Sequence, residues 1–198
     1  MKLFLTMALW LVLLLPGCAK KNNALDLRYT AFPDRTGDQY TYLVSDSVNN
    51  TSYMVNIKVG AISSLDNGAP VTAWIYTYPG HSDTSYVLAN QDSAVFYGNR
   101  QTSPSKIDVL DLYHFPLTVG AKWRTSLTGD TSMVVGLGDI TVEGKTYRNA
   151  YEIHDHGHSY NYTSNKQIWF AQNIGVIRMD YKTLGTNETW QLVNQVIK

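Results

Sequence analysis

The residues best suited to chemistry in this chain form one short segment, His154-Asp155-His156-Gly157-His158. Alternate side chains share a face of a β-strand, so the three histidines would lie on one side. His154 and His156 could chelate one ion, whereas His154 and His158 would be about 13 Å apart on a flat strand. A catalytic zinc site normally takes three protein ligands, so Gly157 would have to turn the chain. Two interpretations stay open: a metal site, or an exposed histidine-rich hairpin tip, which we favour.

The remaining sequence contains no GxSxG, HExxH, Walker A or dinucleotide-binding motif. Three aromatic residues, Trp74, Tyr76 and Trp169, are candidates for a ligand-binding face, because such rings stack on sugars or line a lipid groove. Aromatic residues of this kind more often belong to the core. We therefore expect no enzyme activity, no catalytic residue and no cofactor.

The N-terminus indicates export. Residues 1–17 are predicted to be a signal peptide, because Lys2 precedes an uncharged apolar run of 13 residues, shorter than the roughly 20 that span a membrane. The run ends in the sequence LPGC, which resembles the bacterial lipobox, although its proline departs from the usual small or β-branched residue. That resemblance implies that Cys18 becomes the new N-terminus and carries a diacylglyceryl group and palmitate-type acyl chains.

The same resemblance implies a location. Several acyl chains on one cysteine form a durable membrane anchor. By lipoprotein sorting rules, Ala19 rather than aspartate after the cysteine implies the outer membrane of a Gram-negative bacterium. Residues 18–28 would form the lipidated tether. Cys18 is the only cysteine, so the domain that follows cannot contain an intramolecular disulfide.

Composition favours one β domain with a net charge close to zero. The chain has 16 basic and 16 acidic residues, and removal of residues 1–17 deletes Lys2 alone, which leaves a net charge of −1. Such a chain has no basic surface to attract nucleic acid. Its 14 tyrosines, with many threonines and valines, favour pleated strands. We expect residues 29–198 to form a single domain.

Short β-rich stretches separated by turn residues predict an all-β, mainly antiparallel fold with little helix: a curved sheet, half-barrel or sandwich. The last four or five strands should form a meander, and the final segment, from residue 189, could be strand or helix. The predicted strands are Tyr40–Ser45, Tyr53–Val59, Val71–Tyr78, Val95–Tyr97, Ile107–Leu112, Ser132–Leu137, Ile140–Val142, Tyr147–His154, Ser159–Tyr162, Gln167–Ala171, Val176–Tyr181 and Thr189–Val196.

The sequence also resembles itself. Residues 32–40 and 115–123 share the frame F-P-x-x-x-G-x-x-aromatic, and two weaker matches follow in the same order. Those matches join residues 73–82 with 150–159 and residues 95–97 with 168–170. Ordered self-similarity of this kind is typical of internal duplication. It predicts two pseudo-repeats, residues 29–112 and 113–198.

The second half resembles the C-terminal pattern of uncharacterised TapB-like envelope lipoproteins, whose fold is related to the LolA/LolB half-barrel. The matching positions are Pro116, Gly120 and Trp123, followed by Trp169, Phe170, Ala171, Gly175, Val176 and Ile177. The segment between them, residues 141–147, departs from the family pattern. The resemblance implies a fold with a hydrophobic concave face and brings no established activity.

The leading hypothesis is a membrane-anchored envelope lipoprotein, non-catalytic, whose β domain binds a hydrophobic, glycan or protein ligand. One alternative is a metal-dependent enzyme that uses His154, His156 and His158. The other is a surface adhesin or glycan-binding accessory protein. The lipid anchor makes the membrane the expected partner, and no nucleic-acid partner is expected.

Overall fold

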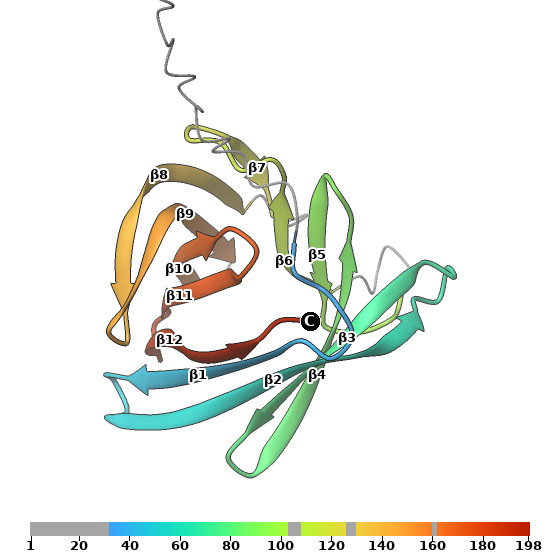
Figure 1. Ribbon diagram of the computed structural model, residues 1–198, viewed down its shortest axis with the longest axis horizontal. Coiled ribbons are helices and arrows are strands. Elements are labelled where there is room, and N and C mark those ends of the chain that lie inside the picture. The colour runs from blue at the N-terminus through green and yellow to red at the C-terminus, as the bar shows by residue number, and fades with distance from the viewer. Residues whose placement is uncertain (1–31, 103–107, 126–129, 160–161) are drawn as a thin grey trace, which may run out of the picture.

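The computed structural model describes residues 32–102, 108–125, 130–159 and 162–198. The predicted signal peptide, Cys18 and the tether lie outside the described residues. The described chain forms twelve strands and no helix (Figure 1). The strands are β1 (Gln39–Asp46), β2 (Thr51–Ser64), β3 (Pro70–Tyr78), β4 (His81–Ala89), β5 (Ser93–Tyr97), β6 (Val109–His114), β7 (Lys122–Arg124), β8 (Thr131–Val142), β9 (Lys145–Ser159), β10 (Tyr162–Ala171), β11 (Gly175–Lys182) and β12 (Asn187–Val196).

All twelve strands belong to one antiparallel sheet, in the order β6-β5-β4-β3-β2-β1-β12-β11-β10-β9-β8-β7. The first strand therefore pairs with the last, and the sheet curls into a nearly closed barrel whose free edges are β6 and β7 (Figure 1). The predicted all-β antiparallel fold is confirmed, as is the meander at its C-terminal end. The ambiguous final segment is strand β12. Within the described ranges no helix is long and apolar enough to cross a bilayer.

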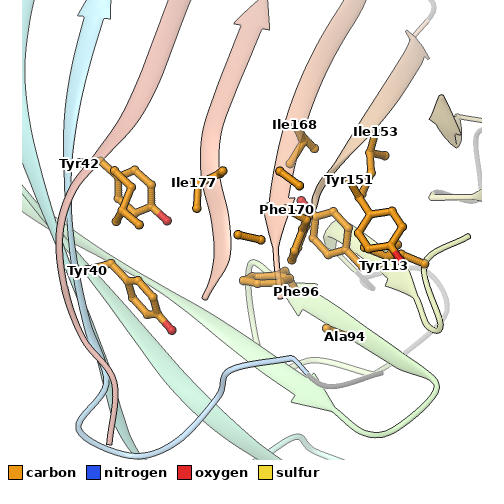
Figure 2. Close-up of a cluster of buried hydrophobic side chains, with 14 of the residues drawn as sticks. Tyr40, Tyr42, Ala94, Phe96, Tyr113, Tyr151, Ile153, Ile168, Phe170 and Ile177 are labelled. Atoms are coloured by element: carbon orange, nitrogen blue, oxygen red, sulfur yellow. The ribbon is translucent and has the colours of Figure 1, made fainter. Parts of the chain in front are cut away.

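Alternation along the strands builds the core. In β1, Tyr40, Tyr42 and Val44 are buried while the residues between them are partly exposed, as expected for a strand with one face toward the interior. Figure 2 shows Tyr40 and Tyr42 directed inward, toward side chains of the opposite strands that include Ile177 and Phe170. All of these strands and core residues lie beyond Phe32, so a chain that begins at Ala19 retains the complete sheet and its core.

The two Phe-Pro frames end in the same kind of glycine turn. Gly37 and Gly120 have φ values of +95° and +89°, a region that glycine adopts without steric cost. Each glycine N–H donates to a carbonyl of the following hairpin, Gly37 to Val59 and Gly120 to Val134, both at 2.8 Å. One frame opens the six strands β1–β6 and the other opens β7–β12. The third sequence match joins β5 with β10, the fifth strand of one half with the fourth of the other. The duplication itself stays a prediction.

Side chains, rather than backbone pairing, link the two free edges. The Trp123 indole on β7 donates to the Leu112 carbonyl on β6 at 2.7 Å, and the ring of His114 lies 6.0 Å from the Trp123 ring. On the interior side, Lys166 of β10 reaches across to Asp111 of β6, with 2.6 Å between Nζ and Oδ1. These contacts hold β6 against the second half of the barrel.

Candidate ligand-binding cavity

A cavity of about 400 Å³ lies inside the barrel, within the usual size range of small-molecule sites. It is bordered by strands of both halves and by the Phe32 side chain at the start of the described chain. Nine aromatic residues line it: Phe32, Tyr40, Tyr42, Trp74, Tyr76, Tyr78, Phe96, Tyr113 and Trp190. Apolar contributions come also from Ile57, Leu110, Ile174, Val176 and Met179. The arrangement favours an apolar molecule with few polar groups.

Trp74 is fixed in the wall by residues of the turn that precedes β1. Its indole Nε1 donates to Asp34 Oδ1 at 2.7 Å, and the Thr72 hydroxyl donates to the same oxygen. Burial raises the pKa of Asp34, and these two hydrogen bonds act in the opposite direction. Tyr40 stacks on Trp74 with 5.5 Å between ring centroids. Because its polar edge is satisfied, the indole can remain in an apolar wall at little cost.

The tyrosine hydroxyl groups of the wall stay neutral. Tyr42 donates to the Val176 carbonyl at 2.6 Å, which joins β1 to β11. Burial raises the pKa values of Tyr42, Tyr76 and Tyr113. The tyrosines therefore contribute rings and neutral hydroxyl groups, and none of the three supplies a phenolate for catalysis near neutral pH.

A buried charge cluster lies at one side of the cavity, formed by Asp111, Lys166 and Asp155. Burial acts to lower the pKa of Lys166, but the adjacent and hydrogen-bonded Asp111 carboxylate, together with Asp155, raises it above its ordinary value. Lys166 therefore stays protonated. Burial raises the pKa of Asp155 from 3.8 to about 6, and Lys166 only partly offsets this. In the described part of the chain no hydrogen-bond donor reaches Asp155 Oδ1.

Replacement of Asp155 by asparagine is expected to raise the free energy of unfolding by about 2–3 kcal/mol at pH 7.5. Between about pH 4 and pH 6 the folded chain holds a proton on Asp155 that the unfolded chain has released, so the stability of the natural chain falls as the pH rises through this window. Urea unfolding at pH 4 and pH 7.5 measures the difference between the two chains. A gain of the same size at both pH values would contradict this account.

The histidine segment lies within strand β9, so the prediction that it forms a hairpin tip is wrong. Gly157 pairs with Ser164 inside the β9–β10 ladder, which continues beyond it to the pair of Ser159 and Tyr162. His154 and His156 are on the outer face with ring centroids 6.3 Å apart, whereas Asp155 between them is buried. The strand alternation inferred from the sequence therefore holds for these two histidines.

The contacts of the outer-face histidines are with polar neighbours. His154 Nε2 lies 2.7 Å from Glu152 Oε1, and His156 Nδ1 lies 2.8 Å from Asn165 Oδ1. Within the described ranges no group of three or more histidine, cysteine, aspartate or glutamate side chains is placed to hold a metal ion. The side chain of His158 lies outside the described residues. The metal-enzyme alternative stays a hypothesis, for which the described residues supply no third ligand.

The three aromatic candidates do not share one face of the sheet. Trp74 and Tyr76 line the cavity. Trp169 alternates with the buried Ile168 and Phe170, and the Arg178 guanidinium lies 5.0 Å from the centroid of its ring. Trp169 is therefore on the outer face, away from the cavity.

The three residues of the charge cluster were not predicted from the sequence as functional residues. The sequence feature that marks them is an acid at an inward position of a strand: Asp111 and Asp155 each occupy such a position on an otherwise apolar face, where an unpaired acid would be costly. Lys166 of β10 pairs in register with Asp155 and contacts Asp111. A search for charged residues at the inward positions of the predicted strands would have found Asp111. Asp155 and Lys166 each lie one residue beyond a predicted strand, because β9 and β10 are longer than the sequence predicts.

Together the barrel and cavity define an all-β protein with an internal cavity. No protein-family model and no curated protein sequence matches the chain. Among solved structures, a candidate exported protein with a YmcC-like fold from Bacteroides fragilis is similar to this chain. The two are 10% identical with a TM-score of 0.51, over 85% of this chain and 99% of that one. This likeness shows the fold.

Two further solved structures are more distant. A candidate lipoprotein from Parabacteroides distasonis is 11% identical with a TM-score of 0.48, covering 85% of this chain and 99% of that one. The complex of MucA and MucB from Pseudomonas aeruginosa gives 11% identity and a TM-score of 0.36, covering 83% of this chain and 52% of the other.

Proposed function

We propose that this chain is a membrane-anchored envelope lipoprotein whose β domain binds an apolar or amphiphilic small molecule in its interior, without catalysis. The observation that carries the proposal is the cavity of about 400 Å³ and its aromatic lining. Small-molecule sites are typically concave and mostly apolar, with a few polar groups that orient the ligand. The hydroxyl groups of Tyr76 and Ser85 and the Asp111 carboxylate are such groups here.

The position of the aromatic rings supports a small ligand over a surface adhesin. Trp74 is only 6% exposed, so its ring is accessible to a molecule that enters the barrel and not to an extended glycan on the outside. The lipid anchor and the outer-membrane location rest on the lipobox-like sequence at Cys18. An intact-mass measurement that finds Cys18 unmodified in the mature chain would refute the anchor.

Filling the cavity tests the proposal. Met179 lines the cavity from β11 and is partly buried, so the larger ring of Met179→Trp should occupy ligand space. We expect the affinity of the neutral fluorescent probe N-phenyl-1-naphthylamine to fall at least tenfold. Met179→Leu is the matched control, because a Met-to-Leu change nearly conserves volume and should leave the affinity within about twofold.

Both measurements use the chain from Ala19, which retains the complete sheet and core. Probe fluorescence gives the dissociation constant, and thermal unfolding shows that each variant is folded. Failure of the folded natural chain to bind the probe, or equal binding by the Met179→Trp variant, would count against an interior ligand site.

A further inference from the structure

The charged groups that line the cavity are all acidic. Asp83 of β4 and Asp111 of β6 belong to the lining, and among the described residues that border the cavity there is no lysine, arginine or histidine. Lys166 neutralises part of the Asp111 charge from behind, but it does not itself line the cavity. A bound molecule therefore meets carboxylates and no cation.

The Asp111 carboxylate retains capacity for a ligand. Its Oδ1 accepts from Lys166 at 2.6 Å, and a carboxylate offers about four acceptor sites on its two oxygens. Asp155 lies close enough to Lys166 to contribute to its charge balance. One ammonium thus faces two carboxylates, so the cluster carries an excess of negative charge when both acids are ionised.

The rings beside Asp111 add to the same preference. Tyr76 and Tyr113 line the cavity near this carboxylate, and Trp74 and Phe96 continue the aromatic wall. The faces of aromatic rings carry negative potential and attract cations, most strongly where water is excluded. A carboxylate or phosphate in the same place would lose its hydration without gaining a cationic partner.

We propose that the cavity selects an apolar molecule that ends in a protonated amine, with the ammonium against Asp111 and the neighbouring rings, and disfavours chains that end in a carboxylate or phosphate. This inference rests on the proposed function, since it specifies the ligand class of the same cavity. Asp83, whose side chain is 71% exposed, places a second carboxylate on the solvent side of the lining. The apolar part of the ligand lies along Ile57, Val176 and Met179.

The test compares three probes of equal chain length, decylammonium, decan-1-ol and decanoate, by isothermal titration calorimetry at pH 7.5 with the chain from Ala19. We expect decylammonium to bind at least tenfold more tightly than decanoate, with decan-1-ol between them. Decanoate binding as tightly as decylammonium overturns the inference while leaving the proposed function in place. Absence of binding by all three overturns both.

Removal of the cavity carboxylate should abolish the preference. In Asp111→Asn the nearby Lys166 ammonium loses its closest partner, so we expect the decylammonium-to-decanoate affinity ratio to fall at least tenfold. Asp139→Asn is the matched control. Asp139 is exposed on β8 and does not line the cavity, and its Oδ1 accepts from the Asn149 N–H, a bond that an amide oxygen preserves.

A second variant covers the case in which Asp111→Asn does not fold. The exposed Asp83 side chain has no buried contact to lose, and Asp83→Asn should lower the ratio two- to threefold. An unchanged ratio in the folded Asp83→Asn and Asp111→Asn chains, or in Asp83→Asn alone if the other does not fold, overturns the inference.

Discussion

Replacement of Lys166 by methionine is expected to lower the free energy of unfolding by about 3–5 kcal/mol at pH 7.5, because it leaves the buried Asp155 and the partly buried Asp111 without their cation. Only 19% of the Lys166 side chain is exposed, and its Nζ lies 2.6 Å from Asp111 Oδ1. Methionine retains most of the aliphatic length but supplies no charge and no donor. Asp111 and Asp155, whose charges already act on each other in the natural chain, would then repel each other without the Lys166 ammonium beside them.

The loss should shrink when the acids are neutralised. The double variant Lys166→Met with Asp111→Asn should recover more than half of it, since the remaining acid no longer faces a second charge. Lowering the pH from 7.5 to 5 should also reduce the loss, because Asp155 already takes up a proton near pH 6 in the natural chain. Urea unfolding followed by tryptophan fluorescence measures all three chains. A loss below about 1 kcal/mol for Lys166→Met would show that the pair is effectively solvated.

This cluster also marks where prediction from sequence stops. Asp111 and Lys166 are 55 residues apart, and they meet only because the sheet curls until β6 approaches β10. Local alternation predicts which face of a strand is inward, as it does for Tyr40 and Tyr42. It does not determine how far a sheet curls, so the sequence predicts a curved sheet, half-barrel or sandwich, whereas the structure is a nearly closed barrel.

Strand boundaries show the same division between local and long-range information. The turns at Gly37 and Gly120 could be located from the two Phe-Pro frames, because each depends on a backbone shape that few residues adopt. The polar start of β4, HSDTS, concealed that strand, whose place is set by pairing with β3. Gly157 was interpreted as a turn residue. In the structure it lies inside the ladder, where a Cβ would meet Ser164 Oγ on the paired strand unless that hydroxyl rotated away.

The cavity depends on the same closure. Trp74 and Trp169 have similar sequence surroundings, yet one lines the interior and the other lies on the outer face beneath Arg178. The difference follows from register: Trp74 is an inward position of β3, whereas Trp169 stands between two inward positions of β10. Composition identifies aromatic residues that could contact a ligand, and only the register of the paired strands selects among them.

Replacement of Phe170 by alanine is expected to lower the free energy of unfolding by about 3–5 kcal/mol, the usual cost of removing a buried aromatic ring. Phe170 of β10 is fully buried, and its ring lies 4.8 Å from that of Tyr113 on β6 and 6.2 Å from that of Phe32. It therefore joins the two walls of the barrel behind the cavity lining. Phe170→Leu, which retains much of the volume, should cost about 1–2 kcal/mol under the same urea unfolding.

The same substitution should change the ligand site as well as the stability. Tyr113 and Phe32 line the cavity, and Phe170 supports both from outside it. Removal of its ring leaves space directly behind these two side chains, and a cavity lined by apolar atoms persists when its surroundings cannot collapse into it. We expect the Phe170→Ala chain to shift its preference from decan-1-ol toward dodecan-1-ol relative to Phe170→Leu. An unchanged preference together with a small loss of stability would mean that the Tyr113 and Phe32 side chains move into the space left by the ring.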